Sequence, residues 1–254
     1  MKAYMAFTKK EFCGCLRTYK LLIILIVFTF IGMISPITAK IMPDIIDTFM
    51  PDNIHFNLPE PTAFDAWAQF FKNMTQMGLI ILVIMFSGIM TKEYHQGTLI
   101  HVLTKGLPRH VVILSKFTMT VVLWTVSYLL CFLVTYAYTL YFWSNDTVSN
   151  LIFSVMCLWV FGILLLALLL LGGVLFNNTY GSLLFTGGLV VFFMMLNLIQ
   201  GFQKYNPINL STHNMSLLKA VKTASDFMPA IIVSSTMIIV TIIAAIMIFN
   251  KKQL

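Results

Sequence analysis

Long apolar runs alternate with short polar stretches along the whole chain. Each run approaches or exceeds the roughly 20 residues that a helix needs to cross the hydrocarbon core of a bilayer. We predict six transmembrane helices, over residues 21–39, 74–91, 111–143, 151–176, 182–200 and 228–249. Backbone groups in lipid must be satisfied within the segment, so such runs indicate helices rather than barrel strands. The pattern predicts an all-α polytopic membrane protein with a single transmembrane domain, residues 1–254.

The first 20 residues carry an amphipathic pattern instead. The apolar side chains fall on one face at helical spacing: Met1, Met5, Phe12, Leu16 and Tyr19. The basic side chains fall beside one another on another face: Lys2, Lys9, Lys10, Arg17 and Lys20. This pattern is typical of a helix that lies among the lipid headgroups. We predict an interfacial helix over residues 1–20; the alternative is an ordinary basic flank of the first span.

Two longer polar stretches are predicted to be outer loops, residues 40–73 and 201–227. Several prolines in the first of them, including Pro43 and Pro51, argue against one long helix. Its last part is expected to be helical already, because a helical stripe starts near Thr62 and enters the membrane around Asn73. The last helix is expected to begin with Pro229 in its first turn, after Asp226 as a cap.

Composition and charge agree with this interpretation. The chain is 59% hydrophobic and 10% charged, whereas a soluble domain is about half apolar and a quarter charged. With both termini in the cytoplasm, most of the 16 lysines and arginines lie in inner segments and most of the nine acidic residues in outer ones. Basic bias orients membrane proteins, so we predict cytoplasmic termini and a multi-pass protein of a bacterial plasma membrane. The net charge of +7 is assigned to residues that flank the spans, not to nucleic-acid binding.

Motifs for catalysis or cofactor binding are absent. The chain has no phosphate-binding GxxxxGKS or GxxxxGKT loop, no HExxH and no GxSxG. Cys13 and Cys15 form a CxC pair without companion ligands, so no metal site is predicted. Ionisable residues are nearly absent from the middle of the spans, which argues against a carrier driven by protons or sodium. No catalytic residue and no cofactor is expected in this chain.

Mildly polar side chains remain inside the predicted spans. Those that would line a path for an amphipathic substrate are Asn73, Gln76, Asn197, Gln200, Ser234 and Ser235. Hydrogen bonds between packed helices are the alternative for each of them. The same alternative applies to the glycine pairs at 172–173 and 187–188, which we interpret as points of close approach between the fourth and fifth spans.

The longest cytoplasmic interruption, residues 92–110, is predicted to be a coupling segment. Gly97 offers a break after the second span, and Thr98 is a plausible helix cap. Leu99 and Leu103 belong to a short apolar stripe, and Pro108 can open the next helix. A short helix held between two membrane helices would transmit a push from a partner into them; the alternative is a mere connecting loop.

This segment resembles a motif of ABC-2-type transporter permeases, E-x-x-x-G-T-L followed by P-x-S/R and then GK. The matching residues are Glu93-Tyr94-His95-Gln96-Gly97-Thr98-Leu99, then Pro108-Arg109 within Lys105–Arg109, then Ser115-Lys116-Phe117. The layout of six spans, the amphipathic start and the long loop before the last span are similar too. Ser115 departs from the pattern, since glycine is common there.

The resemblance implies a permease that pairs with a second copy or a homologous permease and binds two separate ATPase subunits, which hold ATP and Mg. The resemblance also implies that the ATPase docks on the coupling segment. The docking residues would be Glu93, Gly97, Thr98, Leu99, Leu103 and Arg109. The expected function is the transport subunit of an ATP-driven exporter, without enzymatic activity of its own.

The cargo is expected to be amphipathic or hydrophobic, because 22 phenylalanines and 17 methionines suit an adaptable apolar surface. A peptide toxin or antimicrobial peptide comes first. Drug-like molecules, lipid-linked glycans and ions are alternatives for the same kind of permease. A membrane immunity or sensor subunit that transports nothing is the alternative from another class. Membrane lipids are expected partners in every case.

Overall fold

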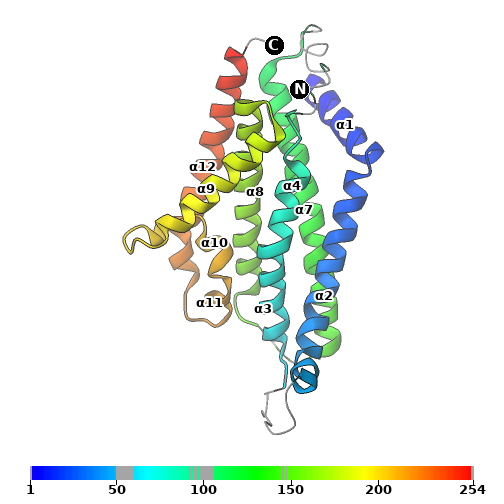
Figure 1. Cartoon of the computed structure of the whole chain (residues 1–254), viewed down its shortest axis with the longest axis vertical. Coiled ribbons are helices and arrows are strands. Elements are labelled where there is room, and N and C mark those ends of the chain that lie inside the picture. The colour runs from blue at the N-terminus through cyan, green and yellow to red at the C-terminus, as the bar shows by residue number, and fades with distance from the viewer. Residues whose placement is uncertain are drawn as a thin grey trace.

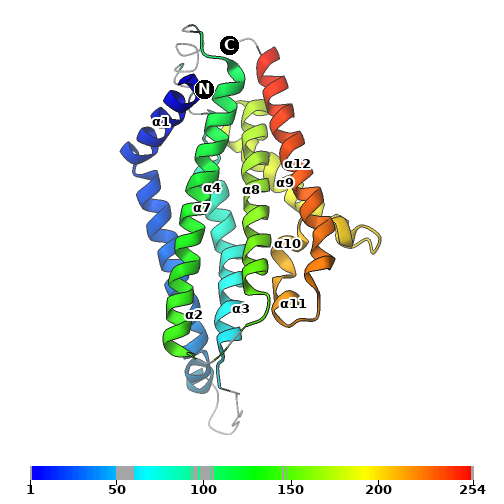
Figure 2. The same cartoon turned by 180° about the vertical axis from the view of Figure 1, so that it is seen from behind.

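The computed structural model describes residues 2–49, 60–91, 93, 97, 104, 106–144, 146 and 148–252, and every regular element in them is helical. Within these residues, six helices are long and apolar enough to cross a membrane: Lys20–Ile45, Ala63–Phe86, Arg109–Phe142, Leu151–Phe176, Thr179–Leu196 and Ala224–Lys251. The chain is therefore an all-α multi-pass membrane protein, as the sequence predicts. Figures 1 and 2 place its two termini at the same end of the molecule.

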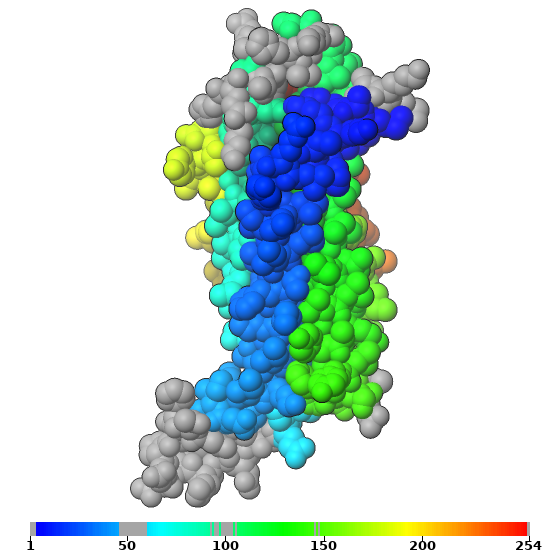
Figure 3. Space-filling model, turned by 90° about the vertical axis from the view of Figure 1, so that its right-hand side faces the viewer, coloured from blue at the N-terminus to red at the C-terminus, as the bar shows by residue number. Residues whose placement is uncertain are grey.

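The first two helices meet at an elbow. Helix α1 (Lys2–Arg17) and helix α2 (Lys20–Phe49) are separated by Thr18 and Tyr19, and the φ of Tyr19, 54°, lies in the left-handed region. The chain changes direction there, so α1 leans away from the axis of α2 (Figure 1). In Figure 3, α1 lies at the upper end of a face formed below it by α2 and α7 (Arg109–Phe142).

Helix α2 is longer than predicted. It continues to Phe49 through Pro36 and Pro43, so the predicted loop is wrong for residues 40–49. A proline inside a helix frees the carbonyl four residues earlier, which for Pro36 is the carbonyl of Gly32. The hydroxyl of Thr135, on α7, donates to that carbonyl at 3.0 Å. Because a neighbouring helix supplies the missing donor, the proline is tolerated.

The second membrane helix has three parts, α3 (Ala63–Asn73), a π-helical turn η1 (Met74–Gly78) and α4 (Leu79–Phe86). Helix α3 begins at Ala63, next to the predicted start near Thr62. The backbone N–H and the hydroxyl of Thr62 both donate to the carboxylate of Asp65, a capping box. The predicted outer loop 40–73 therefore ends in a helix, as the apolar stripe before Asn73 indicated. Single π-helical turns such as η1 often mark functional sites.

Helix α8 (Leu151–Phe176) is the centre of the bundle. Its most apolar stretch is 72% buried inside the protein, compared with 17% for α9 (Thr179–Leu196) and for α12 (Ala224–Lys251). Gly162 of α8 is required by the core, because a Cβ there would lie 2.5 Å from the indole ring of Trp124. That indole is fully buried, stacks on Tyr128 and donates its N–H to the carbonyl of Trp159.

The fifth helix and the segment after it differ most from the prediction. Helix α9 ends at Leu196 rather than 200 and runs obliquely out of the bundle (Figure 1). The predicted loop 201–227 contains η2 (Gln203–Tyr205), α10 (Asn209–Thr212), α11 (Asn214–Leu218) and the first turn of α12. Leu210 and Leu217 are buried against the main core, which explains why this stretch folds back onto the bundle.

The beginning of the last helix also needs correction. Thr223 is the cap of α12, and its backbone N–H and hydroxyl donate to the carboxylate of Asp226 three residues on. Asp226 thus belongs to the first turn and is not the cap. Pro229 lies inside the helix, beyond its first turn. The helix starts at the capping box and not next to Pro229, because the capping box satisfies two groups at the helix start at once.

Candidate functional site

Four charged side chains at the end of the molecule that carries both termini form a closed ring of ion pairs. Lys116 Nζ lies 3.1 Å from Glu11 Oε2 and 3.0 Å from Glu93 Oε2. Lys10 Nζ lies 2.8 Å from Glu93 Oε1 and 3.4 Å from Glu11 Oε1. Cations and carboxylates alternate around this ring, so every charge has two neighbours of opposite sign. We call Lys10, Glu11, Glu93 and Lys116 the ion-pair ring.

The ring joins three separate parts of the chain. Lys10 and Glu11 come from α1, Lys116 from the second turn of α7, and Glu93 from the start of the predicted coupling segment. Phe7 is buried beside the ring, and the hydroxyl of Tyr4 donates to Thr118 Oγ1 at 2.7 Å, so α1 is fixed against α7. Lys116 is only 1% exposed. A charge this deeply buried requires its partners.

The ring also sets the protonation of its members. Burial by itself would raise the pKa of Glu93, but the charges and hydrogen bonds of Lys116 and Lys10 outweigh it, and the pKa is lowered. Burial would lower the pKa of Lys10, but Glu93 and Glu11 together raise it. The carboxylate and the ammonium are therefore both ionised at neutral pH.

These shifts predict that the contribution of the ring to stability is constant over a wide pH range. The lowered pKa of Glu93 gives stability that is complete above its ordinary value of about 4.3 and is lost as pH falls through the folded value. The raised pKa of Lys10 gives stability that is complete below about 10.4 and is lost as pH rises through its folded value. The difference in unfolding temperature between the wild type and Glu93→Gln should stay constant from about pH 5 to 9. A step near neutral pH would contradict the lowered pKa of Glu93.

The other predicted coupling residues fall into two groups. Thr98, Leu99 and Leu103 lie outside the described residues. Gly97 has a φ of 63°, a conformation that favours glycine and suits the predicted break. Arg109 is engaged with its own chain, since one of its nitrogens, Nη1, donates to the carbonyls of Phe249, Asn250 and Lys252 at the end of α12.

The six predicted path residues are not gathered in one cavity. The amide of Asn73 donates to Ser35 Oγ at 3.0 Å, a contact between α3 and α2. Ser234 is buried and donates to the carbonyl of Ala230, whereas its neighbour Ser235 is exposed. Asn197 and Gln200 line a polar pocket of about 400 Å³ beyond the end of α9. For Asn73 and Ser234, contacts within the protein account for the polar side chain.

Gln76 lines an apolar groove of about 590 Å³ between the second and fifth membrane helices. Ile80 and Val83 come from α4, Gly187 and Val190 from α9. Most of its polar residues come from the π-helical turn and from α10, and one comes from α9: Thr75, Gln76, Ser211, Thr212 and Thr186. Ser211 and Thr212 were missed by sequence reasoning, because the stretch 201–227 was interpreted as a loop.

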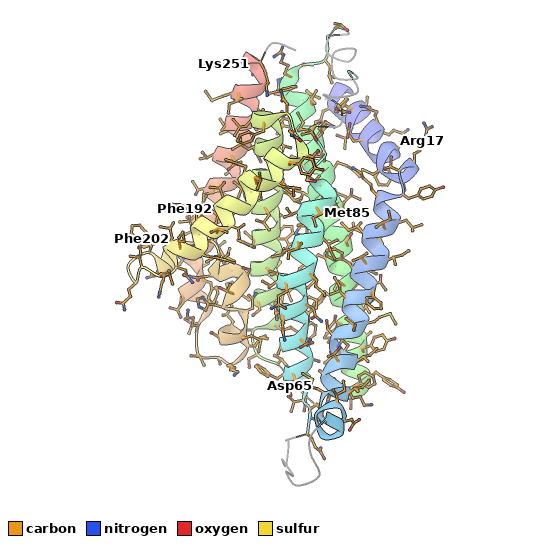
Figure 4. All side chains as sticks on the ribbon, viewed as in Figure 1. Arg17, Asp65, Met85, Phe192, Phe202 and Lys251 are labelled. Carbon is orange, nitrogen blue, oxygen red and sulfur yellow. The ribbon has the colours of Figure 1, made fainter. Side chains whose placement is uncertain are left out.

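Helix α9 presents an open apolar face next to this groove. Leu184, Val191 and Met195 of α9 are exposed and recur at helical spacing, and Leu198, just beyond the end of α9, is exposed too. Figure 4 shows the outer part of α9, around Phe192, standing away from the bundle, with Phe202 farther out. A Cβ at Gly187 or Gly188 would meet no atom within 4 Å, so the predicted contact of this pair with α8 is wrong. Gly172 does face α9, at Ser182 and Phe185, while Gly173 faces Met90.

Two comparisons with known proteins found no match. No protein-family model matches the chain, and no curated protein matches it. The functional assignment therefore depends on the residues and geometry described above.

Proposed function

We propose that the chain is the permease subunit of an ATP-driven exporter. The observation that carries this proposal is the position of Glu93. It opens the coupling segment and is held at 3.0 Å by a buried lysine of α7 and at 2.8 Å by a lysine of α1. A partner that moves this segment moves two other helices with it. Two separate ATPase subunits, which bind ATP and Mg, would supply that movement.

The mechanism follows from the connections of the ring. Closure of the ATPases on ATP displaces residues 92–110, and the ion-pair ring carries the displacement to α1 and α7. The same segment follows α4, which forms one wall of the apolar groove. Nucleotide states that bind two arrangements of the segment with different affinity shift the population between them. The groove would then open to one side of the membrane in one arrangement and to the other side in the second.

A second permease copy would complete the path. The open face of α9 and the glycine pair at its middle allow another helix to approach closely. The groove between α4 and α9 lies beside this face, so pairing of two copies would enclose two grooves in one passage. Its apolar walls and polar residues suit an amphipathic cargo. A peptide toxin or antimicrobial peptide is our first choice; drug-like molecules and lipid-linked glycans follow.

The test is to purify the full chain together with the products of the neighbouring genes, among which we expect an ATPase subunit. We expect the two to elute together and ATP turnover to depend on this chain. Replacing Glu93 with Gln removes one negative charge from the ring and should reduce the permease-dependent turnover by about tenfold or more, since hydrogen bonds to charged groups are worth about 1.5–3 kcal/mol. Insertion into the membrane should be unchanged.

Glu60→Gln is the matched control, because Glu60 is exposed and lies three residues before α3, whose first turn with Asp65 stands at the opposite end of the molecule from Lys251 (Figure 4). Full ATPase binding and turnover with Glu93→Gln would refute the role of Glu93. Cargo movement by the isolated chain, without any ATPase, would refute the exporter itself. A chain that binds an ATPase but moves no cargo would favour the sensor or immunity alternative.

A further inference from the structure

Helix α1 has a face that no described part of the protein covers. Its opposite side packs on the bundle through Phe7 and Glu11. On the open side, Met5, Phe12 and Leu16 are exposed although all three are apolar. At about 100° per residue these three positions fall within a sector of roughly 40°, so they form one narrow stripe along the helix.

The stripe continues onto the membrane helix. Tyr19 at the elbow is 67% exposed, and Leu22, Ile23 and Ile26 carry the exposed apolar surface into α2. Because α2 is a candidate span, this surface leads without interruption from α1 to the part of α2 that faces acyl chains. A soluble partner would have to cover α1 alone and stop at the elbow, whereas a bilayer covers both segments.

Two cations lie on one side of the stripe. Lys9 and Arg17 are exposed, and in the described part of the chain neither forms an ion pair. By the same helical geometry they lie about 40° and 120° from Met5, on one side of the stripe. Lys10 lies farther round and is already held by Glu93 and Glu11. The open face of α1 thus combines an apolar stripe with one basic edge.

We propose that this face of α1 binds anionic phospholipid headgroups, with Lys9 and Arg17 at the phosphates and the apolar stripe in the upper acyl region. Each lysine or arginine near an anionic surface strengthens binding by about fivefold. Zwitterionic lipid offers the same apolar region without the net negative charge, so binding depends on lipid composition. The inference rests on the six candidate spans and on α1, and holds whether or not the chain is an exporter.

Through the ion-pair ring, lipid bound to α1 would also affect the position of Glu93. Lys10 and Glu11 of the ring are part of α1, one turn or less from Lys9 and two turns or less from Arg17. Anionic lipid that holds α1 in place therefore also holds the side chains that fix Glu93. The composition of the bilayer acts in this way on the start of the coupling segment.

Hydrogen–deuterium exchange of the full chain in lipid nanodiscs tests the proposal. One set of discs contains phosphatidylcholine alone, and the other also contains phosphatidylglycerol. We expect the backbone amides of α1 to exchange about fivefold or more slowly in the anionic discs. The Lys9→Gln/Arg17→Gln variant should lose this difference while exchanging like the wild type in phosphatidylcholine. The control variant Lys72→Gln/Lys204→Gln removes two exposed lysines elsewhere and should keep it.

Equal exchange of wild-type α1 in the two sets of discs would overturn the proposal. So would a lipid-dependent difference that survives in the Lys9→Gln/Arg17→Gln variant. Soluble polyglutamate added to phosphatidylcholine discs is the probe for the rival occupant. Protection of α1 by this polymer, together with no effect of phosphatidylglycerol, would assign the face to an acidic protein surface instead of lipid.

Discussion

Replacing Lys116 with methionine is expected to detach α1 from α7. Methionine has a similar length but no charge, so Glu11 and Glu93 would face each other across a site in which only the half-exposed Lys10 remains. Removal of one partner from a buried ion pair destabilises a protein by about 3–5 kcal/mol, because the remaining charge is buried without compensation. Lys116→Arg keeps the cation and should recover most of the loss.

The thiol of Cys15 reports this detachment. It is half-buried beside the ring, in a cavity of about 260 Å³ that Lys116 and Glu93 also line, and burial raises the pKa of the thiol. Release of α1 should therefore accelerate alkylation of Cys15 by about tenfold or more, in line with the energy above. Cys13 is exposed already and should react equally fast in both proteins. An unchanged rate at Cys15 and an unchanged unfolding temperature would show that the ring does not hold α1.

The spans could be predicted because their signal is local. A run of apolar residues is long enough to cross a bilayer whatever surrounds it, and each predicted run overlaps a long helix. The predicted ends are wrong for the second span, which ends at Phe86 rather than 91, and for the fifth, which ends at Leu196 rather than 200. Helix α2 continues past its predicted end through Pro43, whereas Pro36, inside the predicted span, is tolerated because a neighbouring helix replaces the donor that this proline removes. The donor that replaces it, the hydroxyl of Thr135, lies about 100 residues away in the sequence. Similarly, α10 and α11 are too short to show a clear period, and they are ordered by burial against the core.

In the candidate site, too, some residues had a local signal in the sequence and others are explained only by contacts that the fold creates. Glu93 and Lys116 both stand in the motif that resembles the permease family, and their direct contact is a consequence of the fold. Lys10 and Glu11 are the ring members that the sequence did not indicate, because both stand in a helix assigned to the lipid surface. The path residues were chosen by polarity alone. Apolar helices do not reveal which side faces protein, so Ser234 and Ser235 could not be told apart, although only Ser234 is buried.

Gly32→Val is expected to be among the most damaging changes in the spans. A Cβ on Gly32 would lie 2.7 Å from the carbonyl oxygen of Cys131 and 3.2 Å from Val134 Cβ, and a backbone oxygen cannot move aside. Separation of α2 from α7 would also break the hydrogen bond that Thr135 donates to the carbonyl freed by Pro36. Overpacking costs about 1–3 kcal/mol, and the lost hydrogen bond adds about 1 kcal/mol.

Thermal unfolding of the purified chain measures this effect, with Gly14→Val as the matched control. Gly14 is also inside a helix, and a Cβ there would meet no atom within 4 Å, so only the intrinsic preference of the helix changes. Thr135→Val isolates the hydrogen bond and should lose about 1 kcal/mol. Equal losses for Gly32→Val and Gly14→Val would mean that α2 and α7 are not in close contact at Gly32. A loss confined to Gly32→Val would place Gly32, Pro36 and Thr135 in one unit, in which the glycine admits the neighbouring helix and the neighbouring helix makes the proline tolerable.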